Sequence, residues 1–462
     1  MFQVPRLVIA APGSGHGKTT VATGLMAALR DRGLEVSGHK IGPDYIDPGY
    51  HALATGRPPR NLDPVLQGEH RVAPLFLHGA LTPRPADVAV VEGVMGLFDG
   101  AIGTGGMAST AHVARLLDAP VVLVVDVSGA SRSVAATVLG FAGYDPRVRI
   151  AGVILNRVAS QRHEDEIREA LQPTGVAVLG SLGRDEGLAT PSRHLGLVPA
   201  VERADEAQAA VRLLGARVAA GTDLDAVLRV ARSAAPLSAT AWNPADEVSA
   251  SPGPAPLVAS AGGSAFSFRY TETDELLAAA GAQVVDVDPL RDQALPAQTS
   301  ALYLGGGFPE VYVEELSANV LLRADVFQRI GSGLPVVAEC AGLLYLCREL
   351  DGLPLVGAVD ATAEMTGRLT LGYRQATASQ DSLLTATGES VTGHEFHRTQ
   401  VLPGHGSPPA WQFRDTGYGG RTEGFASARL HASFLHVHWA GHPQAAQRFV
   451  AAAAKHAEPV RG

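Results

Sequence analysis

A run of small and polar residues near the start of the chain has the residue types of a phosphate-binding loop. The apolar segment Leu7–Ala11 is followed by Pro-Gly-Ser-Gly-His-Gly and then by a lysine and two threonines. Glycines let backbone N–H groups converge on an anion, and a helix that begins at the loop adds its positive dipole end. The lysine can bridge the outer phosphates of a nucleotide, and the hydroxyl beside it suits Mg²⁺. The predicted ATP-binding residues of this loop are Gly13, Gly15, Gly17, Lys18, Thr19 and Thr20.

The residues around Cys340 are typical of a nucleophile at a sharp turn between a strand and a helix. The apolar run Leu334–Ala338 precedes the turn, and small residues follow the cysteine. This position predicts an exposed thiol at the edge of a sheet, with a pKa lowered by the dipole of the following helix. Backbone N–H groups of a triple glycine upstream can form an oxyanion hole. The predicted oxyanion donors are Gly306, Gly307 and Ala341.

A thiolate of this kind needs a base, and the histidine-rich segment Leu430–Trp439 supplies candidates. His436 and His438 are two residues apart, so they share one face of a predicted strand. Spacing alone does not choose between them. The predicted catalytic pair is therefore Cys340 with His436, and His438 is the alternative base.

Polar residues also follow the predicted strands of the first half, where parallel α/β sheets bind ligands. After the second strand, Gly-Pro and Asp-Pro pairs predict a rigid turn that displays Lys40, Asp44, Tyr45 and Asp47. Asn156 follows a later strand, where its side-chain amide can read the edge of a purine. These residues extend the predicted nucleotide site along one edge of the sheet.

Charged residues nearby suggest a metal ion and an anionic substrate. Glu92 ends a strand beside a glycine and is a candidate carboxylate ligand of Mg²⁺, whereas Asp99 is a weaker candidate. Arg57 and Arg60 lie on a proline-stiffened loop, where two guanidinium groups can receive a carboxylate-rich substrate. We therefore expect a local basic patch that includes both arginines.

The segments that must position these residues alternate between apolar strands and helices up to about residue 200. The strands are near-continuous apolar runs, as a sheet covered on both faces requires. The predicted strands are Leu7–Ala11, Leu34–His39, Asp87–Glu92, Pro120–Val127, Arg149–Asn156 and Val176–Leu182. The predicted helices are Thr19–Arg30, Ala108–Leu117, Ser133–Ala142 and Glu164–Leu171. This order predicts a parallel, doubly wound α/β domain.

A second α/β pattern begins at Leu257. It includes predicted helices at Thr273–Ala280 and Leu343–Leu350 and strands at Gln283–Val287 and Ala301–Leu304. Before it lies a stretch rich in Pro, Gly, Ser and Ala without periodicity, which is typical of a linker. The predicted organisation is a P-loop ATP-binding domain at residues 1–235, a linker at 236–255 and a second doubly wound domain at 256–450.

Composition narrows the functional classes. A chain of 462 residues fits two or three domains. The formal net charge of −9, with no Lys/Arg cluster, argues against nucleic acid or an anionic membrane surface as the main partner. Two cysteines are too few for a disulfide framework, and no apolar run has the length of a signal peptide or a membrane span. We expect a cytoplasmic protein that is a monomer or a homodimer.

The two chemical centres together predict a coupled reaction. ATP activates a carboxylate as an acyl phosphate, the thiolate releases ammonia from glutamine, and ammonia displaces phosphate to form an amide. With these motifs in order, the sequence resembles the cobyrinic or hydrogenobyrinic acid a,c-diamide synthase family over nearly its full length. The segments that carry the resemblance are Ser14–Thr20, Lys40–Pro48, Gly56–Asp63, Val91–Gly100, Gly305–Glu310, Ala338–Leu343, Gly393–His397 and Ser433–His438.

The resemblance implies a class I-like glutamine amidotransferase domain at the C-terminal end, with Cys340 as nucleophile and His436 as the residue that raises its nucleophilicity. It implies a Cys-His dyad, because the place of the usual acidic third member holds His438. The implied reaction is ATP- and glutamine-dependent amidation of the c and then the a carboxylates of a corrin ring. The Mg²⁺ ligands are predicted to be Thr19, Asp44 and Glu92. The predicted substrate residues are Lys40, Asp44, Tyr45, Arg57, Arg60 and Asp99.

Three alternatives share part of this pattern. The cobyric acid synthases amidate other side chains and do not read Gly-Pro-Asp-Tyr after the second strand, which disfavours them. A nickel-sirohydrochlorin diamide synthase uses the same motifs on another tetrapyrrole. The non-enzymatic alternative is a MinD-like ATPase switch, because this loop, with Pro12 at the first glycine position of the usual pattern, resembles the variant loop of the dethiobiotin-synthetase and MinD-like ATPases. That alternative predicts no glutaminase half.

Overall fold

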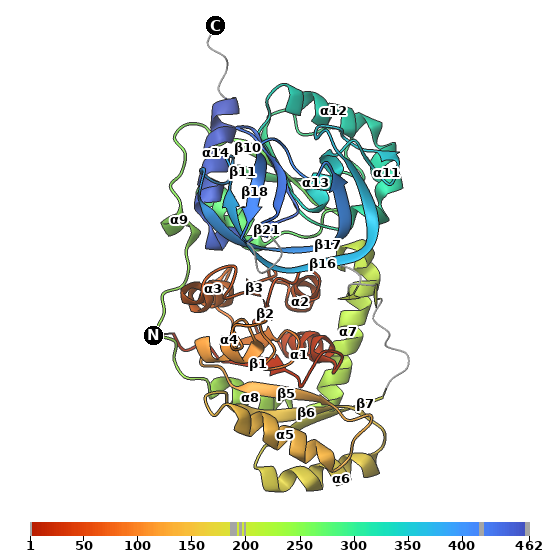
Figure 1. The fold of residues 1–462 in the computed structure, drawn as a ribbon. Helices are drawn as coiled ribbons and strands as arrows, with labels where there is room; N and C mark the ends of the chain where they lie inside the picture. Colours follow the sequence, from red (N-terminus) through yellow and green to blue (C-terminus); the bar gives the residue numbers. More distant parts are fainter. Residues whose placement is uncertain (1, 185–191, 194–195, 198–199, 415–419, 458–462) are drawn as a thin grey trace. The chain divides into compact units, whose positions relative to one another are not determined.

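The computed structural model describes residues 2–184, 192–193, 196–197, 200–414 and 420–457 (Figure 1). The chain divides into two compact units, Met1–Trp242 and Asn243–Gly462. The division falls within the stretch 236–255 that lacks sequence periodicity. None of the helices in the described ranges combines the length and the apolar character needed to cross a bilayer.

The described part of the first unit is built on a seven-stranded parallel sheet in the order β3-β2-β4-β1-β5-β6-β7. Its central strands are buried along their length, because their apolar runs are covered on both faces. The parallel, doubly wound prediction is therefore confirmed. The strand bounds are β1 Arg6–Ala10, β2 Val36–Ile41, β3 Asn61–Leu62, β4 Val88–Glu92, β5 Val121–Asp126, β6 Ile150–Val158 and β7 Val178–Gly183.

Helices connect these strands, and α1, α2 and α7 pack together (Figure 1). Two glycines allow the close approach of α1 and α7: a Cβ on Gly24 would stand 2.7 Å from the carbonyl oxygen of Leu214, and one on Gly215 would stand 2.9 Å from Cβ of Ala27. The remaining elements of this unit are α1 Lys18–Asp31, α2 Asp47–Thr55, α3 Glu69–Leu81, α4 Thr110–Leu116, α5 Ser133–Tyr144, α6 Gln161–Leu171, η1 Gln172–Thr174, β8 Ser192–Arg193, β9 Gly196–Leu197, η2 Ala200–Arg203, α7 Ala204–Gly221 and α8 Leu224–Arg232.

The rigid turn predicted after the second strand is wrong in its second half. Asp47 and Pro48 begin helix α2, because a proline in the first turn needs no N–H donor and its fixed φ suits a helix. The Asp44 carboxylate caps this start by accepting hydrogen bonds from the backbone N–H groups of Ile46 (2.8 Å) and Asp47 (3.0 Å). Helix α3, which the sequence did not predict, begins after Gly68 and contains an internal proline.

The second unit contains a twelve-stranded mixed sheet in its described part. Strands β11-β10-β12-β13-β20 are parallel, and β19, β18 and β16 extend the sheet with antiparallel pairs. The strand bounds are β10 Leu257–Ala261, β11 Gln283–Val287, β12 Thr299–Leu304, β13 Val336–Glu339, β14 Glu349–Leu350, β15 Leu353–Pro354, β16 Thr362–Ala378, β17 Ser390–Leu402, β18 Pro409–Phe413, β19 Thr422–Ala426, β20 Leu430–Ser433 and β21 His436–Val437. The helices are α9 Pro244–Glu247, α10 Thr271–Ala279, η3 Pro309–Val311, α11 Val313–Ala318, α12 Val320–Gly331, α13 Ala341–Leu346, η4 Trp439–Gly441 and α14 Gln444–Ala457.

Two features of this unit differ from the sequence prediction. The helix predicted to reach Leu350 ends at Leu346, because the chain turns at Cys347 into the short strand β14. Strands β16 and β17 form a long antiparallel pair (Figure 1), with a shift of register between Met365 and Thr370. This pair was not predicted, since β16 is largely exposed or half-buried and neither strand carries a continuous apolar run.

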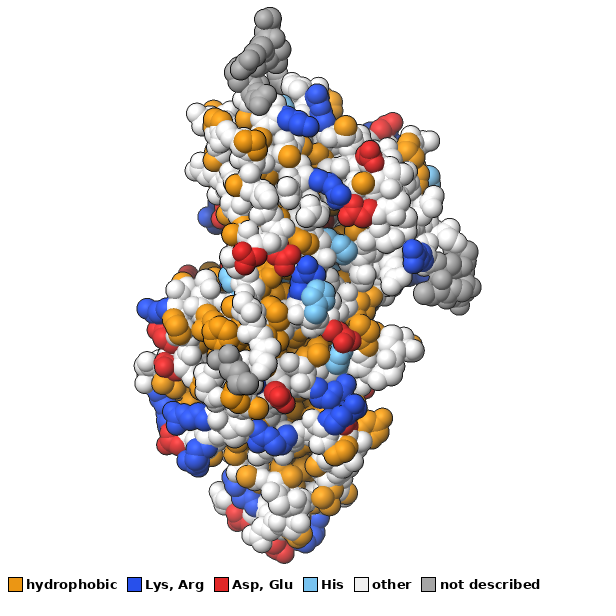
Figure 2. Space-filling model, turned by 90° about the vertical axis from the view of Figure 1, so that its left-hand side faces the viewer, with side chains coloured by type: hydrophobic (Ala, Val, Ile, Leu, Met, Phe, Trp, Pro, Cys, Tyr) orange, Lys and Arg blue, Asp and Glu red, His pale blue; other side chains and the backbone are white. Residues whose placement is uncertain are grey.

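Surface charge is dispersed on the face drawn in Figure 2. Lys and Arg side chains occur there in small groups separated by acidic and uncharged side chains, with no continuous basic stripe among the described residues of that face. Such a distribution disfavours binding to an extended polyanion through this face.

Candidate active sites

The phosphate-binding loop joins β1 to α1 through glycines in the left-handed region. Gly15 has φ +81° and Gly17 has φ +93°, and Gly17 is the residue before the first turn of α1. Both conformations strain residues that carry a Cβ. The Lys18 ammonium donates to the carbonyl oxygen of Gly13 at 3.0 Å, which folds the side chain back over the loop. Burial, together with Lys40, lowers the pKa of Lys18 to about 8.

A dense polar cluster lies beside this loop at the carboxyl ends of β2 and β4. Glu92 accepts a hydrogen bond from the Thr19 hydroxyl at 2.6 Å and from the Lys40 ammonium at 2.9 Å. Its other carboxylate oxygen is 2.6 Å from Nε2 of His51. Asp47, at the start of α2, accepts from Lys40 at 2.6 Å and from Thr19 at 3.3 Å. The cluster therefore joins four segments of the chain around one buried lysine.

The charges of the cluster are mutually dependent. Burial opposes the charge of Lys40, but the carboxylates of Asp47 and Glu92 outweigh it and raise the Lys40 pKa. Burial likewise opposes ionisation of Glu92, but Lys40, His51 and Thr19 hold its pKa below the ordinary value. Burial, followed by the carboxylate of Asp44, raises the pKa of Asp47 to about 8. The cluster thus holds two carboxylates, Asp47 and Glu92, and two basic side chains, Lys40 and His51.

The donor set contains oxygen ligands of the kind that Mg²⁺ prefers. The Thr19 hydroxyl contacts carboxylate oxygens of both Asp47 and Glu92, whereas the Asp44 carboxylate accepts backbone N–H groups at the start of α2. These contacts make Asp47 a further candidate ligand, and Asp44 stays a predicted one. No group of three His, Cys, Asp or Glu side chains forms a metal cage within the described ranges. This fits Mg²⁺, which takes one or two carboxylates and completes its shell with phosphates and water.

The structure places the other predicted residues of this half around the loop. Asn156 donates from Nδ2 to the carbonyl oxygen of His16 at 2.9 Å, and its Oδ1 accepts from the backbone N–H of Arg157 at 3.0 Å. Its amide therefore supports the loop, and purine recognition stays a prediction. The exposed Asp99 accepts from the N–H of Gly96 at 2.9 Å, in a turn that lies against the loop. Tyr45 is half-buried just before α2.

The predicted basic patch of Arg57 and Arg60 is wrong. Both side chains are buried, with 6% and 3% of their surface exposed. One nitrogen of the Arg57 guanidinium donates to the carbonyl oxygens of Gly79, Ala80 and Thr82 at the end of α3. Arg57 lies near Glu35, just before β2, and therefore at the edge of the sheet opposite the phosphate-binding loop. The sequence of a proline-rich loop does not indicate whether an arginine side chain points to solvent or into the core.

Cys340 occupies a strained turn between β13 and α13, as a nucleophile at this position requires. Its φ of +49° lies in the left-handed region, which is uncommon for a residue with a side chain. Its N–H donates to the carbonyl oxygen of Ser433 at 2.7 Å. The thiol is not exposed, however: only 4% of the residue surface is accessible, and burial, reinforced by Glu310, raises the thiol pKa. The six-residue helix α13 does not offset this burial, so the predicted low pKa is wrong.

The predicted oxyanion donors differ in their availability. Gly306 forms a two-way bridge with Phe268, and its N–H donates to the Phe268 carbonyl oxygen at 3.1 Å, so this N–H is already used. The N–H of Ala341 points to the thiol and lowers its pKa, against the larger effect of burial. Gly307 passes so close to Ala265 that a Cβ would stand 2.1 Å from the Ala265 carbonyl oxygen. Ala341 and Gly307 remain predicted donors, and Gly306 does not.

The two candidate bases have different surroundings. The His436 ring lies against Gly306, where a Cβ would approach its Cε1 to 2.5 Å, and its Nδ1 is 3.7 Å from the carboxylate of Glu339. Glu339 directly precedes the nucleophile. His438 instead lies against Tyr270, with the two rings tilted by 32° and their centroids 4.1 Å apart, and its Nε2 is 3.7 Å from Glu272. His436 thus lies beside Gly306 and the residue that precedes Cys340, and its role as the base stays a prediction.

A buried carboxylate that the sequence did not reveal supports residues 433–435. This short segment contacts Cys340 and directly precedes His436. Glu423 accepts a hydrogen bond from the Ser433 hydroxyl at 2.6 Å and from the N–H of Phe434 at 2.9 Å. Ser433 in turn accepts, at its hydroxyl, the N–H of Leu435 at 2.9 Å. Burial raises the pKa of Glu423 to about 7. Because these contacts are tertiary, no spacing in the sequence indicated them.

Each of the two units contains a match to a known domain family. Residues 7–198 match the CobQ/CobB/MinD/ParA nucleotide binding domain, and residues 258–444 match the CobB/CobQ-like glutamine amidotransferase domain. The sequence is 60% identical over 459 residues to hydrogenobyrinate a,c-diamide synthase of Thermobifida fusca (strain YX), covering 97% of each chain. The chain belongs to the a,c-diamide synthase family. It is also 59% identical to the Streptomyces coelicolor hydrogenobyrinate enzyme, again with 97% of each chain covered.

A more distant relative carries a different name. Cobyrinate a,c-diamide synthase of Synechococcus sp. is 43% identical over 457 residues, which cover 96% of this chain and 98% of that protein. The family assignment confirms the resemblance, the two kinds of domain and the class of glutamine-dependent amidating ligase.

Proposed function

We propose that this enzyme amidates the a and c side-chain carboxylates of hydrogenobyrinic acid, with ATP and L-glutamine as co-substrates, in cobalamin biosynthesis. The observation that carries the proposal is the full-length similarity to hydrogenobyrinate a,c-diamide synthases at 59–60% identity, against 43% for the Synechococcus cobyrinate enzyme. This difference favours the metal-free ring over its cobalt form. A ring that carries nickel is the second alternative among tetrapyrroles.

In the first unit, the loop from Gly13 to Thr19 would hold the ATP phosphates, with Lys18 turning from the Gly13 carbonyl to the outer phosphates. A substrate carboxylate attacks the γ-phosphorus, ADP leaves, and an acyl phosphate forms. Thr19, Asp47 and Glu92 are the residues that would hold Mg²⁺, which neutralises phosphate charge when bound. Lys40, held by Asp47 and Glu92, would supply a fixed positive charge near the phosphates.

In the second unit, His436 would take the Cys340 proton as the sulfur attacks the side-chain amide carbon of glutamine. The proton then passes to the leaving nitrogen, ammonia departs, and water hydrolyses the thioester to glutamate. The N–H groups of Ala341 and Gly307 would stabilise the oxyanion. A raised thiol pKa means that the sulfur stays neutral until a base accepts its proton, so the attack on glutamine needs the proposed base.

A substrate panel tests the proposal. Purified enzyme with ATP, Mg²⁺ and glutamine is given hydrogenobyrinic acid, cobyrinic acid or nickel-sirohydrochlorin, and amide products are counted by mass spectrometry. We expect two amidations of hydrogenobyrinic acid at the highest kcat/KM. Faster turnover of either metallated ring would contradict the assignment of substrate, and no product from any ring would contradict the proposed function as a whole.

A further inference from the structure

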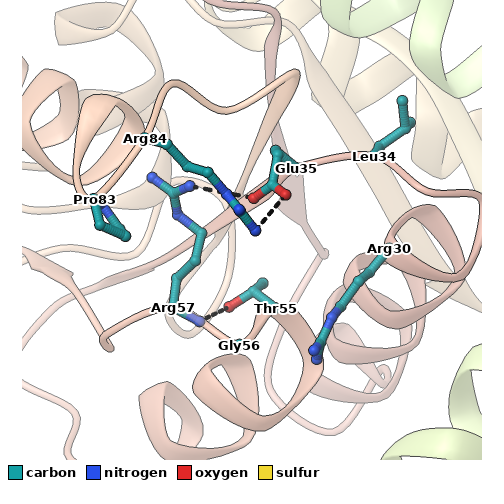
Figure 3. A pocket seen from close by; sticks show the side chains of 8 residues that line it. All are labelled: Arg30, Leu34, Glu35, Thr55, Gly56, Arg57, Pro83 and Arg84. Carbon is teal, nitrogen blue, oxygen red and sulfur yellow. Dashed lines mark hydrogen bonds and ion pairs between the residues drawn. The ribbon is translucent and has the colours of Figure 1, made fainter.

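A cavity of about 260 Å³ opens at the edge of the first sheet that is opposite the phosphate-binding loop. It lies where β2 begins and where α1 and α2 end, and Figure 3 shows its lining side chains around a central space. Three of the lining residues are arginines and one is a glutamate, so the cavity carries excess positive charge in a chain of net charge −9. The lining residues are Arg30, Leu34, Glu35, Thr55, Gly56, Arg57, Pro83 and Arg84.

Arg57 provides a buried cation at this cavity with unused hydrogen-bonding capacity. Its Nη2 is fully engaged with carbonyl oxygens, but its Nε and Nη1 are buried and make no hydrogen bond within the described part of the chain. The nearest carboxylate oxygen, from Glu35, is 3.8 Å from Nη1. Burial lowers the Arg57 pKa, and although Glu35 raises it, Arg60 and Arg84 lower it further. A buried guanidinium with unused N–H donors is costly unless an anion approaches it.

The other two arginines complete a convergent set. Arg84 pairs with Glu35 at 2.6 Å, yet 70% of its side chain is exposed, so it can turn toward a ligand (Figure 3). Arg30 comes from the end of α1 and donates to the carbonyl oxygens of Leu53 and Ala54 at the end of α2. Gly56 leaves room for its guanidinium, because a Cβ there would stand 3.0 Å from Nη2 of Arg30.

We propose that Arg30, Arg57 and Arg84 form a second anion site, separate from the phosphate-binding loop, which takes a phosphate-class dianion. The fork of a guanidinium matches the spacing of phosphate oxygens, and three such groups exceed the single charge of Glu35. The cavity volume suits a free phosphate ion or the phosphate group of a nucleoside monophosphate. The ligand would displace the Glu35 carboxylate from Arg84.

This position connects the second site to the first. The six residues of β2 and the fourteen of α1 span roughly 20 Å each, and they run from the cavity to Lys40 and Thr19 in the polar cluster. Helix α2 runs from Thr55 at the cavity to Asp47 in the same cluster. An anion that holds the ends of α1 and α2 together would therefore act on elements that carry the ATP site.

Calorimetric titration of the full chain with inorganic phosphate tests the proposal. A non-hydrolysable ATP analogue and Mg²⁺ first fill the phosphate-binding loop, and ionic strength is held constant. We expect one phosphate-binding event to remain, and Arg84→Ala and Arg30→Ala each to weaken it about tenfold, as the loss of one charge-assisted hydrogen bond does. Both side chains are exposed, so these variants should fold normally.

The matched control is Arg32→Ala, which removes an exposed arginine from the same end of α1. Arg32 pairs with Asp225 and does not line the cavity. It should leave the phosphate affinity unchanged.

A parallel titration with AMP separates the two sources of phosphate. Tighter binding of AMP would identify a nucleoside monophosphate as the ligand, and tighter binding of inorganic phosphate would identify the free ion. Absence of binding to the analogue-filled chain, or equal affinity in wild type, Arg84→Ala and Arg30→Ala, would overturn the proposal. The measurement is of binding alone, so its failure leaves the amidation proposal untouched.

Discussion

The two chemical centres of this enzyme differ in their electrostatics: one is built from charged side chains, and the other is a buried, uncharged thiol. Beside the phosphate-binding loop, Lys18, Lys40, Asp47 and Glu92 form a network of charges within hydrogen-bonding distance of one another or of the loop. Around Cys340, burial dominates instead, and the thiol is held neutral. A centre that binds phosphates must present charge before its ligand arrives, whereas a thiol that should react only with bound glutamine is better kept protonated.

The largest expected effect separates the two histidines. His436→Asn should lower glutamine-dependent kcat at least 10²-fold, because the buried thiol then has no base, and should leave amidation from ammonium salts unchanged. His438→Asn is the matched control and should lose much less, since its ring packs on Tyr270 beside Glu272. Steady-state rates with both nitrogen sources measure this. A larger loss from the His438 variant would reverse the assignment of the base.

The next effect separates two neighbouring aspartates of the charged centre. Asp47→Asn should raise the Mg²⁺ concentration needed for half-maximal activity about tenfold or more, since it removes one of two carboxylates at the proposed metal position. Asp44→Asn keeps an N-cap for α2 and should alter that concentration little. Mg²⁺ titrations of ATP-dependent turnover provide the comparison. Equal shifts in both variants would show that Asp44 is also a ligand.

The smallest effect concerns Glu423, the buried carboxylate of the thiol half. Its folded pKa of about 7 exceeds the ordinary value of 4.5, so the folded state retains a proton that the unfolded state releases. The stability of this unit should therefore fall as the pH rises from about 4.5 to 7 and then level off, and Glu423→Gln should remove that dependence. Thermal transitions of both proteins at pH 5 and pH 8 measure it. The variant should gain stability relative to wild type at pH 8, and an identical difference at the two pH values would contradict the prediction.

Much of the fold of the first unit could be predicted from its sequence, because the apolar runs and the glycine loop indicate the same structure that tertiary packing requires. The apolar runs that became β1, β4 and β5 are buried on both faces, and Lys18 follows a glycine loop whose backbone only glycines readily adopt. Asp47 was misread because Asp-Pro suits both a turn and a helix start. Capping by Asp44, visible only in three dimensions, decides between them.

In the second unit, the position of Cys340 was predictable but its protonation was not. A strand-to-helix turn is a local pattern, whereas the pKa of the thiol depends on burial by residues distant in sequence. The same reason hid Glu423, whose partners Ser433 and Phe434 are about ten residues away. Long-range burial and hydrogen bonds set what these groups do, and no spacing rule reports them.

The central claim is the division of labour between a nucleotide centre and a thiol centre. The most direct test compares glutamine with ammonium as nitrogen source in Cys340→Ala and Lys18→Ala, by mass-spectrometric assay of amide product from hydrogenobyrinic acid. The account predicts that Cys340→Ala loses turnover with glutamine but retains it with ammonium, and that Lys18→Ala loses both. Equal loss with the two nitrogen sources in Cys340→Ala, or ammonium-dependent product from Lys18→Ala at the wild-type rate, would contradict it.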